Sequence, residues 1–197
     1  MERADVNRWS GVLTTARLRL APLAAPLADG WGRYWERNRA HFALTAPPVP
    51  AGPALVEWAR ESAARAARAG DEDVAYRFVL LAREGGDDAV LGHVSFTEIV
   101  RGPLQACNLG FGLDAAQVGQ GLMREALTAG ISFAFDVKRL HRIAANHLPT
   151  NERSARTLRA LGFVPEGYAR DYLFMGGAWR DHVLTALTNP ALEGQIS

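Results

Sequence analysis

Cysteine and long hydrophobic runs are scarce in this 197-residue sequence. The single cysteine, Cys107, excludes an intrachain disulfide and is typical of a reducing compartment. The sequence has no run of about 18 hydrophobic residues, and its charged start, MERADVNRWSGVL, lacks the hydrophobic segment of a secretion signal. We therefore expect a cytoplasmic protein that does not enter a membrane.

An excess of one charge is also missing, because 22 lysines and arginines balance 21 aspartates and glutamates to a net charge of +1. Proteins whose affinity comes mainly from neutralising a nucleic-acid backbone are more basic than this, so we predict no direct nucleic-acid site. The five histidines form no H-E-x-x-H pair and have no cysteine partners. We predict no metal site.

The residues that are present favour one compact domain. Hydrophobic residues make up 48% of the chain and charged residues 22%, which is typical of a globular protein. No internal repeat or low-complexity linker divides the chain. We expect a single domain over 1–197 with its core at about 13–188.

Hydrophobic periodicity predicts a mixed α/β chain. Leu18 and Leu20 alternate with arginines as in a half-buried strand, the helix ALVEWARESAARAARAG is expected to stop at Gly70, and Asn151 is expected to cap a later helix. The glycines of REGGDD predict a hairpin turn. In order, we predict strand 15–23, helices 24–42 and 54–70, strands 74–82, 89–100 and 106–114, helix 122–135, strand 141–148, helix 151–163, and strands 164–174 and 178–187.

The stretch VGQGLMREAL, residues 118–127, places two glycines directly before a helix. A helix N-terminus has free N–H groups and a partial positive charge, so a phosphate bound there gains hydrogen bonds and dipole energy together. Gly119 and Gly121 lack the Cβ atoms that would obstruct a diphosphate. An ordinary strand-to-helix turn that needs positive φ angles explains the same ten residues equally well.

Two nucleotide-binding motifs do not fit this stretch. A dinucleotide fingerprint requires a third glycine after an early parallel strand, whereas here three consecutive strands of a predicted meander precede the turn. A P-loop requires G-K-[ST], which QGLMRE lacks.

The chain resembles the GNAT superfamily of acetyl-CoA-dependent N-acetyltransferases, and most closely its ribosomal-protein-alanine N-acetyltransferases of the RimJ type. The resemblance covers nearly the whole chain. It rests on the stretches LTTARLRL, VRGPLQACNLGF, GQGLMREALTA, HRIAANHLPTNERS, LGFVPEGYARDYL and WRDHVLTALT. The superfamily's diphosphate turn, Q/R-x-x-G-x-G/A, is altered here, with Val118 at its first position and Met123 at its last.

This resemblance implies a mixed, mostly antiparallel sheet that splays open around the pantetheine arm of acetyl-CoA, flanked by helices. The arm would bond to the backbone of Phe111, Gly112 and Leu113. The diphosphate would bond to the amides of Gly119, Gln120, Gly121, Leu122, Met123 and Arg124, and Asn151 and Ser154 would also contact the cofactor.

The reaction would be attack of a neutral amine on a thioester, which requires positioning, deprotonation of the amine and protonation of the leaving thiolate. By resemblance, Ser154 is the candidate acid, although a hydroxyl on a helix surface is the ordinary alternative. Glu98 is the first candidate base and Asp171 the second, although an exposed carboxylate at a strand end is the more ordinary interpretation of Glu98.

Residues near the C-terminus suggest an acceptor site. Tyr168, Arg170 and Tyr172 would alternate onto one strand face and line the acceptor cleft with Arg101, unless these aromatic residues only pack across strands. A catalytic Asp181–His182 pair is disfavoured, because neighbouring strand residues point to opposite faces.

Three functions remain open. The first is acetylation of the N-terminal α-amine of a protein, by resemblance a ribosomal protein that begins with alanine. The second is acetylation of a small-molecule amine, and the third is non-catalytic binding of acyl-CoA. The stretches EGYARDYL and WRDHVLTAL favour the first. We expect a monomer or a homodimer.

Overall fold

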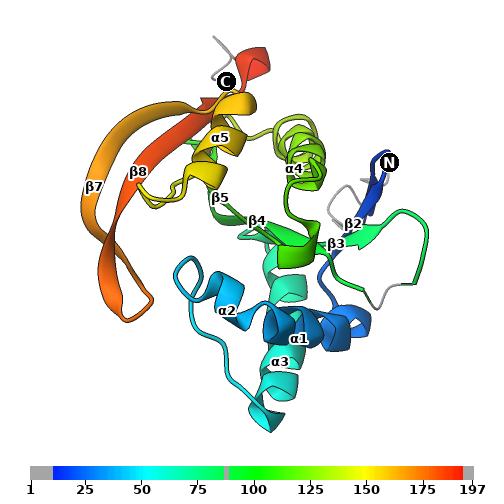
Figure 1. Ribbon diagram of the computed structural model, residues 1–197. Coiled ribbons are helices and arrows are strands. Elements are labelled where there is room, and N and C mark those ends of the chain that lie inside the picture. Colours follow the sequence, from blue (N-terminus) through cyan, green and yellow to red (C-terminus); the bar gives the residue numbers. More distant parts are fainter. Residues whose placement is uncertain (1–10, 87–88, 193–197) are drawn as a thin grey trace, which may run out of the picture.

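The computed structural model describes residues 11–86 and 89–192, which form one eight-stranded sheet flanked by helices (Figure 1). The predicted mixed α/β class is confirmed. Most of the stretch considered as a secretion signal lies outside the described residues. The strands, in sheet order, are β1 (Leu13–Thr14), β2 (Leu18–Pro22), β3 (Tyr76–Ala82), β4 (Gly92–Val100), β5 (Ala106–Leu113), β6 (Arg142–Ala144), β8 (Ala178–Thr188) and β7 (Val164–Met175).

Helices cover both faces of the sheet. On one face α4 (Leu122–Ser132) packs on a core that includes Phe78, Phe96 and Leu127. On the other face α1 (Ala28–Arg37) and α3 (Pro53–Asp71) enclose a second core around Val79 and Leu81. Strand β3 contributes to both cores because its successive side chains point to opposite faces. The remaining helices are α2 (Arg39–Phe42), α5 (Glu152–Ala160) and the short turns η1 (Ala25–Leu27), η2 (Ala115–Gln117), η3 (Phe133–Val137) and η4 (Pro190–Leu192).

The sheet changes character between β5 and β6. All neighbours from β1 to β5 pair antiparallel, whereas β5 and β6 run parallel and share only the pairs from Ala106–Arg142 to Asn108–Ala144. Beyond Asn108, β5 continues beside β4, while the chain after β6 continues along β8, with His147 bridging Val183. The two halves of the sheet therefore part at this point, as the predicted splay requires.

Several predicted helices differ at their ends. The helix expected at 24–42 is interrupted at Asn38, whose buried side chain donates to the Tyr34 carbonyl and accepts from the Ala115 N–H. Gly70 does not stop its helix, because α3 continues to Asp71. The helix expected at 122–135 changes to a π-helical turn, η3, after Ser132. Long-range side-chain contacts such as those of Asn38 leave no local sequence pattern.

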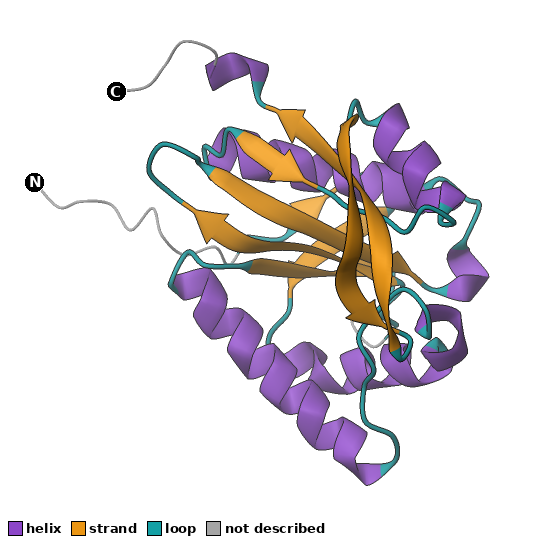
Figure 2. Cartoon of the chain, turned by 90° about the vertical axis from the view of Figure 1, so that its left-hand side faces the viewer, coloured by secondary structure: helices purple, strands orange, loops and turns teal. Residues whose placement is uncertain are grey.

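The strand predictions hold better. The strand predicted at 15–23 is limited to β2, because residues 15–17 form the turn that follows β1. The strand expected at 141–148 is limited to β6, since only three residues pair on both sides. The hairpin of β7 and β8 turns at Gly176 and Gly177, both with positive φ. Figure 2 shows this hairpin as two long, curved neighbouring strands. Part of the REGGDD turn, residues 87 and 88, lies outside the described residues.

No helix within residues 11–86 and 89–192 is long and apolar enough to cross a bilayer.

Candidate functional site

A cleft of about 1180 Å³ lies where β5 and β6 part. It is bordered by the turn before α4, by the second half of β5, by the start of α5, by the C-terminal hairpin and by aromatic side chains from α1 and α3. Elements from most of the chain thus converge on one cavity.

The turn before α4 has the geometry of an anion cradle. Gly119 has φ 88° and Gly121, the N-cap of α4, has φ 75°, which is the left-handed region where a side chain adds strain. Among the described residues, no side chain caps α4, so its first N–H groups stay open for another acceptor. Both glycines, together with Val118, Met123 and Arg124, line the cleft.

Two other residues of this turn have their side chains directed elsewhere. The Leu122 side chain is buried in the core beneath α4, and the amide of Gln120 donates to the Ala116 carbonyl at 3.3 Å. Only their backbone groups are available for the predicted role.

Asp114 anchors the other end of the turn. Its carboxylate accepts from the Ala116 N–H at 2.9 Å, from the Asn38 amide at 3.1 Å and from the Arg37 guanidinium. Desolvation raises the pKa of Asp114, but these donors outweigh it and hold the pKa below its usual value. An ionised Asp114 therefore fixes the turn to α1 at neutral pH.

The second half of β5 supplies a free backbone edge. Phe111, Gly112 and Leu113 pair with β4 on one side, but β6 pairs only as far as Asn108. Some of their N–H and C=O groups therefore face the cleft without a strand partner, and all three residues line it. A Cβ at Gly112 would lie 2.6 Å from Cε1 of His93, so glycine is required there by close packing.

Asn151 and Ser154 lie together at the start of α5. The Asn151 side-chain oxygen accepts from the Ser154 backbone N–H at 3.1 Å, which confirms the predicted N-cap. Both residues line the cleft.

The two candidate bases are separated by the structure. Glu98 lies on an irregularity of β4 between Thr97 and Val100, has φ 53°, accepts from the Asn108 amide and lines the cleft. Asp171 is not among the lining residues, and its backbone N–H donates to the Asp181 carboxylate at 2.9 Å. Only Glu98 is brought to the cavity.

Most of the predicted acceptor residues do not line the cleft. Arg101 pairs with Asp73 at 2.6 Å, and neither Arg101, Tyr168 nor Arg170 lines the cleft. The prediction that Tyr168, Arg170 and Tyr172 share one face is wrong. The β7–β8 register shifts between Ala169 and Leu173, which interrupts the alternation.

The two tyrosines consequently contact neighbouring β8 residues that point to opposite faces. Tyr168 donates to Asp181 at 2.6 Å, while the Tyr172 ring lies 5.4 Å from that of His182. Only Tyr172 lines the cleft. Asp181 and His182 thus contact different tyrosines, in keeping with side chains that point to opposite faces.

An aromatic wall was missed from the sequence. Trp31, Trp35, Phe42, Trp58 and His93 line the cleft from the face that α1 and α3 cover. Within the described chain, the buried Nε1 of Trp35 has no hydrogen-bond partner. Burial, followed by the charge of Arg77, lowers the pKa of His93 to about 3. Helical spacing identified several of these aromatic residues as packing residues. It could not show which of them line the cleft and which lie only in the core.

His147 and His182 also line the cleft without having been predicted. Within the described ranges, no group of three or more His, Cys, Asp and Glu side chains could hold a metal ion.

Comparison with known proteins gives the family of this architecture. Residues 17–164 match the family model "Acetyltransferase (GNAT) domain". A 101-residue segment is 50% identical to the [Ribosomal protein uS5]-alanine N-acetyltransferase of Escherichia coli. That segment covers 51% of this chain and 52% of the relative, so the match spans about half of the curated protein.

Solved structures match over a greater length. The ribosomal-protein-S5-alanine acetyltransferase of Vibrio fischeri is 32% identical, with 91% of this chain and 97% of that chain covered and a TM-score of 0.83. RimJ of Mycobacterium smegmatis, solved in complex with CoA-disulfide, is 26% identical, with 95% and 91% covered and a TM-score of 0.84. The chain therefore belongs to the GNAT acetyltransferase family.

Proposed function

We propose that this protein transfers the acetyl group of acetyl-CoA to the N-terminal α-amine of a protein, and that the acceptor is a ribosomal protein that begins with alanine. The observation that carries the proposal is the cleft between β5 and β6, bordered by an uncapped helix start whose two glycines have positive φ. The relatives named above support the acceptor class, since two of them modify an alanine of a ribosomal protein.

The residues present fit acetyl-CoA. The N–H groups at the start of α4 would hold the diphosphate, because the helix end offers both donors and positive potential. The unpaired edge of β5 at Phe111, Gly112 and Leu113 would bond to the pantetheine arm, which carries amide groups of its own. The thioester would then lie in the same cleft, which Glu98 and Ser154 also line.

The chemistry joins the acceptor nitrogen to the acetyl carbonyl carbon through a tetrahedral oxyanion, after which the carbon–sulfur bond breaks. Glu98, directly or through water, would accept the proton that the amine loses. The Ser154 hydroxyl would donate a proton to the departing CoA thiolate. Attack requires a neutral amine, and an ordinary α-amine has a pKa of about 7.7 to 8.0, against about 10.4 for lysine. Deprotonating lysine therefore costs about 3.4 kcal/mol more than deprotonating the α-amine, so a single carboxylate base favours the α-amine as acceptor.

The experiment uses purified protein, acetyl-CoA and three peptides: one that begins with alanine, one that begins with serine, and one with a blocked N-terminus and an internal lysine. Release of CoA thiol and mass spectrometry of the peptides are measured. We expect acetylation only of free α-amines, with the alanine peptide preferred. Acetylation of the lysine alone would overturn the acceptor class. Binding of CoA without turnover on any of these peptides or on small amines would overturn the proposed activity.

A further inference from the structure

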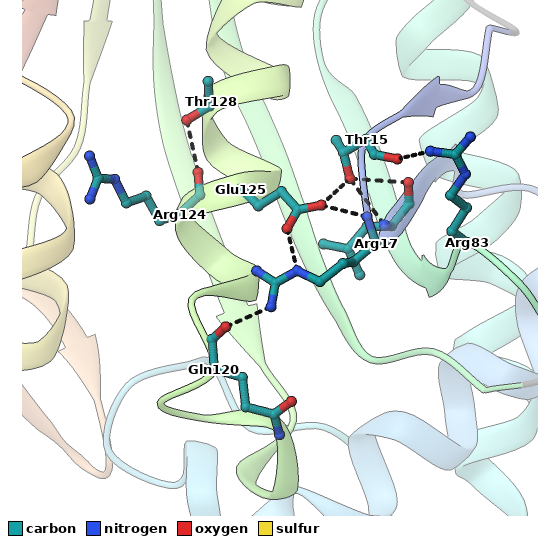
Figure 3. Close-up of polar contacts among 8 residues, drawn as sticks. Thr15, Arg17, Arg83, Gln120, Arg124, Glu125 and Thr128 are labelled. Carbon is teal, nitrogen blue, oxygen red and sulfur yellow. Dashed lines mark hydrogen bonds and ion pairs between the residues drawn. The ribbon is translucent and has the colours of Figure 1, made fainter.

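Behind the turn that precedes α4, Arg17 forms a clamp (Figure 3). Its backbone N–H donates to Glu125 Oε1 at 2.7 Å and its Nε donates to Oε2 at 2.7 Å. Its Nη1 donates to the carbonyl oxygen of Gln120 at 2.9 Å. One residue of the β1–β2 turn thus holds both the diphosphate turn and the first helical turn behind it.

Thr15 completes the clamp from the same turn. Its hydroxyl contacts Oε1 of Glu125 at 2.6 Å, and its Oγ1 accepts the Leu18 N–H at 3.0 Å. The bonds to Glu125 join residues that are 108 to 110 positions apart in the chain. Desolvation raises the pKa of Glu125, but the donors from Thr15 and Arg17 outweigh it and hold the pKa below its usual value. Glu125 is therefore an anion at neutral pH.

The clamp lies on the side of the turn away from the cleft. Arg17 and Glu125 are not among the lining residues, whereas Gly121 and Arg124 are. In Figure 3 the Arg124 side chain extends away from the clamp, on the opposite side of α4 from Arg17. Arg17 Nη2 would lie 3.6 Å from a Cβ placed on Gly121, so the guanidinium lies directly against the backbone of the turn.

This placement has a geometric consequence for the cradle. The Gln120 carbonyl and the Gly121 N–H belong to one planar, trans peptide unit, in which the two groups point in opposite directions. Since Arg17 holds the carbonyl from behind, the Gly121 N–H is turned toward the cleft. Gly121, on one side of this unit, gives it rotational freedom that a fixed hydrogen bond removes.

The ion pair between Arg17 and Glu125 also affects the electrostatic potential at the cradle. An acidic side chain in the first turn of a helix occupies the same positive potential that a bound phosphate would use. Glu125 is the acidic residue in the first turn of α4. The guanidinium of Arg17, 2.7 Å from its carboxylate, neutralises that charge close to the cradle.

We propose that Arg17 is a positioning residue for the cofactor's diphosphate: it orients the Gln120–Gly121 peptide and neutralises Glu125, without touching the substrate. This inference rests on the proposed acetyl-CoA site, and it assigns a role to the N-terminal TARL stretch that lies far from the site in sequence.

The test compares Arg17→Ala with the native protein in two assays. Calorimetry measures the Kd for CoA, and steady-state kinetics compare acetyl-CoA with S-acetylpantetheine, a donor that lacks the diphosphate. Loss of a charge-assisted hydrogen bond predicts a roughly tenfold weaker Kd for CoA and a similar fall in kcat/KM with acetyl-CoA. The kcat/KM with S-acetylpantetheine stays unchanged. Arg17→Lys, which keeps the charge but cannot make both side-chain contacts, gives an intermediate Kd.

Two further variants distinguish an effect on the position of the turn from a general loss of folding stability. Arg83→Ala removes a neighbouring arginine whose Nη1 donates to the Thr15 carbonyl at 3.0 Å, and it keeps the native Kd for CoA. Arg17→Ala/Glu125→Gln binds CoA more tightly than Arg17→Ala alone, because the uncompensated carboxylate is gone.

A native Kd for CoA in Arg17→Ala would overturn the inference and leave the proposed function intact. An equal loss with S-acetylpantetheine, or in Arg83→Ala, would also overturn it, since the variant would then act through the fold. Native protein that binds CoA but acetylates no amine would overturn the proposed activity, while the CoA affinities would still decide the role of Arg17. Native protein that binds no CoA would overturn both.

Discussion

The side-chain oxygen of Asn151 accepts a hydrogen bond from the backbone N–H of Ser154 at 3.1 Å, which fixes the serine on the first turn of α5. Within the described chain, the Ser154 hydroxyl makes no hydrogen bond of its own, although it borders the cleft. A hydroxyl held by its backbone and free at its oxygen is suited to donate a proton to a leaving group. Replacing it should affect chemistry more than folding.

Ser154→Ala should therefore lower kcat by about 100-fold, the lower end of the effect of a general acid, with a much smaller change in the Kd for CoA. The helix cap by Asn151 is kept, because it uses the backbone N–H of residue 154, which alanine also has. Thr128→Ala is the matched control, since that hydroxyl donates to the Arg124 carbonyl and does not line the cleft. Steady-state kinetics and calorimetry measure both quantities. Equal losses in kcat and affinity would make Ser154 a binding residue only.

Glu98→Gln should reduce kcat/KM for the α-amine by about 100-fold near neutral pH, because the amide keeps the shape of the side chain but accepts no proton. The loss should shrink as the pH rises and more of the amine is neutral. Asp171→Asn should leave kcat/KM near the native value, since Asp171 does not line the cleft. A pH series of initial rates distinguishes the two, and a larger loss in Asp171→Asn would reverse the assignment.

Gly121→Ala should weaken CoA binding, and by more than the loss of folding stability alone would cause. A side chain in the left-handed region costs about 1 to 2 kcal/mol, and a shift of the backbone that relieves this strain would move the N–H groups of the turn. The methyl group itself would lie on the side of Arg17, 3.6 Å from its Nη2. Gly102→Ala is the matched control, because Gly102 has φ 72°, has no atom within 4 Å of its would-be Cβ and does not line the cleft. Chemical denaturation should show similar losses of stability in both variants. Weaker CoA binding should appear in Gly121→Ala alone, and native affinity there would contradict the cradle.

His93 should make the fold sensitive to acid. Its pKa is lowered to about 3, so between pH 6.5 and 3 the unfolded chain binds a proton that the folded chain excludes. Stability is therefore lost as the pH falls below about 6.5, by about 2 kcal/mol at pH 5 from this group. His93→Phe should show a smaller fall in the free energy of unfolding between pH 7.5 and pH 5.

The control for this effect is Tyr34→Phe. It removes the hydroxyl that lies 3.1 Å from His93 Nδ1 but keeps the surrounding rings, and it should retain the native acid sensitivity. Urea unfolding at the two pH values tests both variants. The interpretation fails if His93→Phe loses as much stability on acidification as the native protein.

The local patterns of the sequence predicted much of the fold. Asn151 was identified as a cap because the bond it makes spans only three residues. The glycine pair at 119 and 121 marked the turn, since its positive φ angles are a local requirement. The strands and α3 followed from periodicity for the same reason.

Other parts of the site depend on contacts that leave no local pattern. The irregularity of β4 that carries Glu98 depends on pairing with β5, and the register shift near Asp171 depends on pairing with β8. Strand alternation alone therefore placed Tyr168 and Tyr172 on one face incorrectly. The bond between Arg17 and Glu125 joins residues 108 positions apart, a contact that periodicity cannot reveal.

The most direct test is a crystal structure of the protein with CoA. We predict that the diphosphate oxygens lie within hydrogen-bonding distance of the backbone amides of residues 119–124, with the pantetheine arm along β5 between β5 and β6. CoA bound anywhere else, or a diphosphate that makes no contact with this turn, would contradict the central claim.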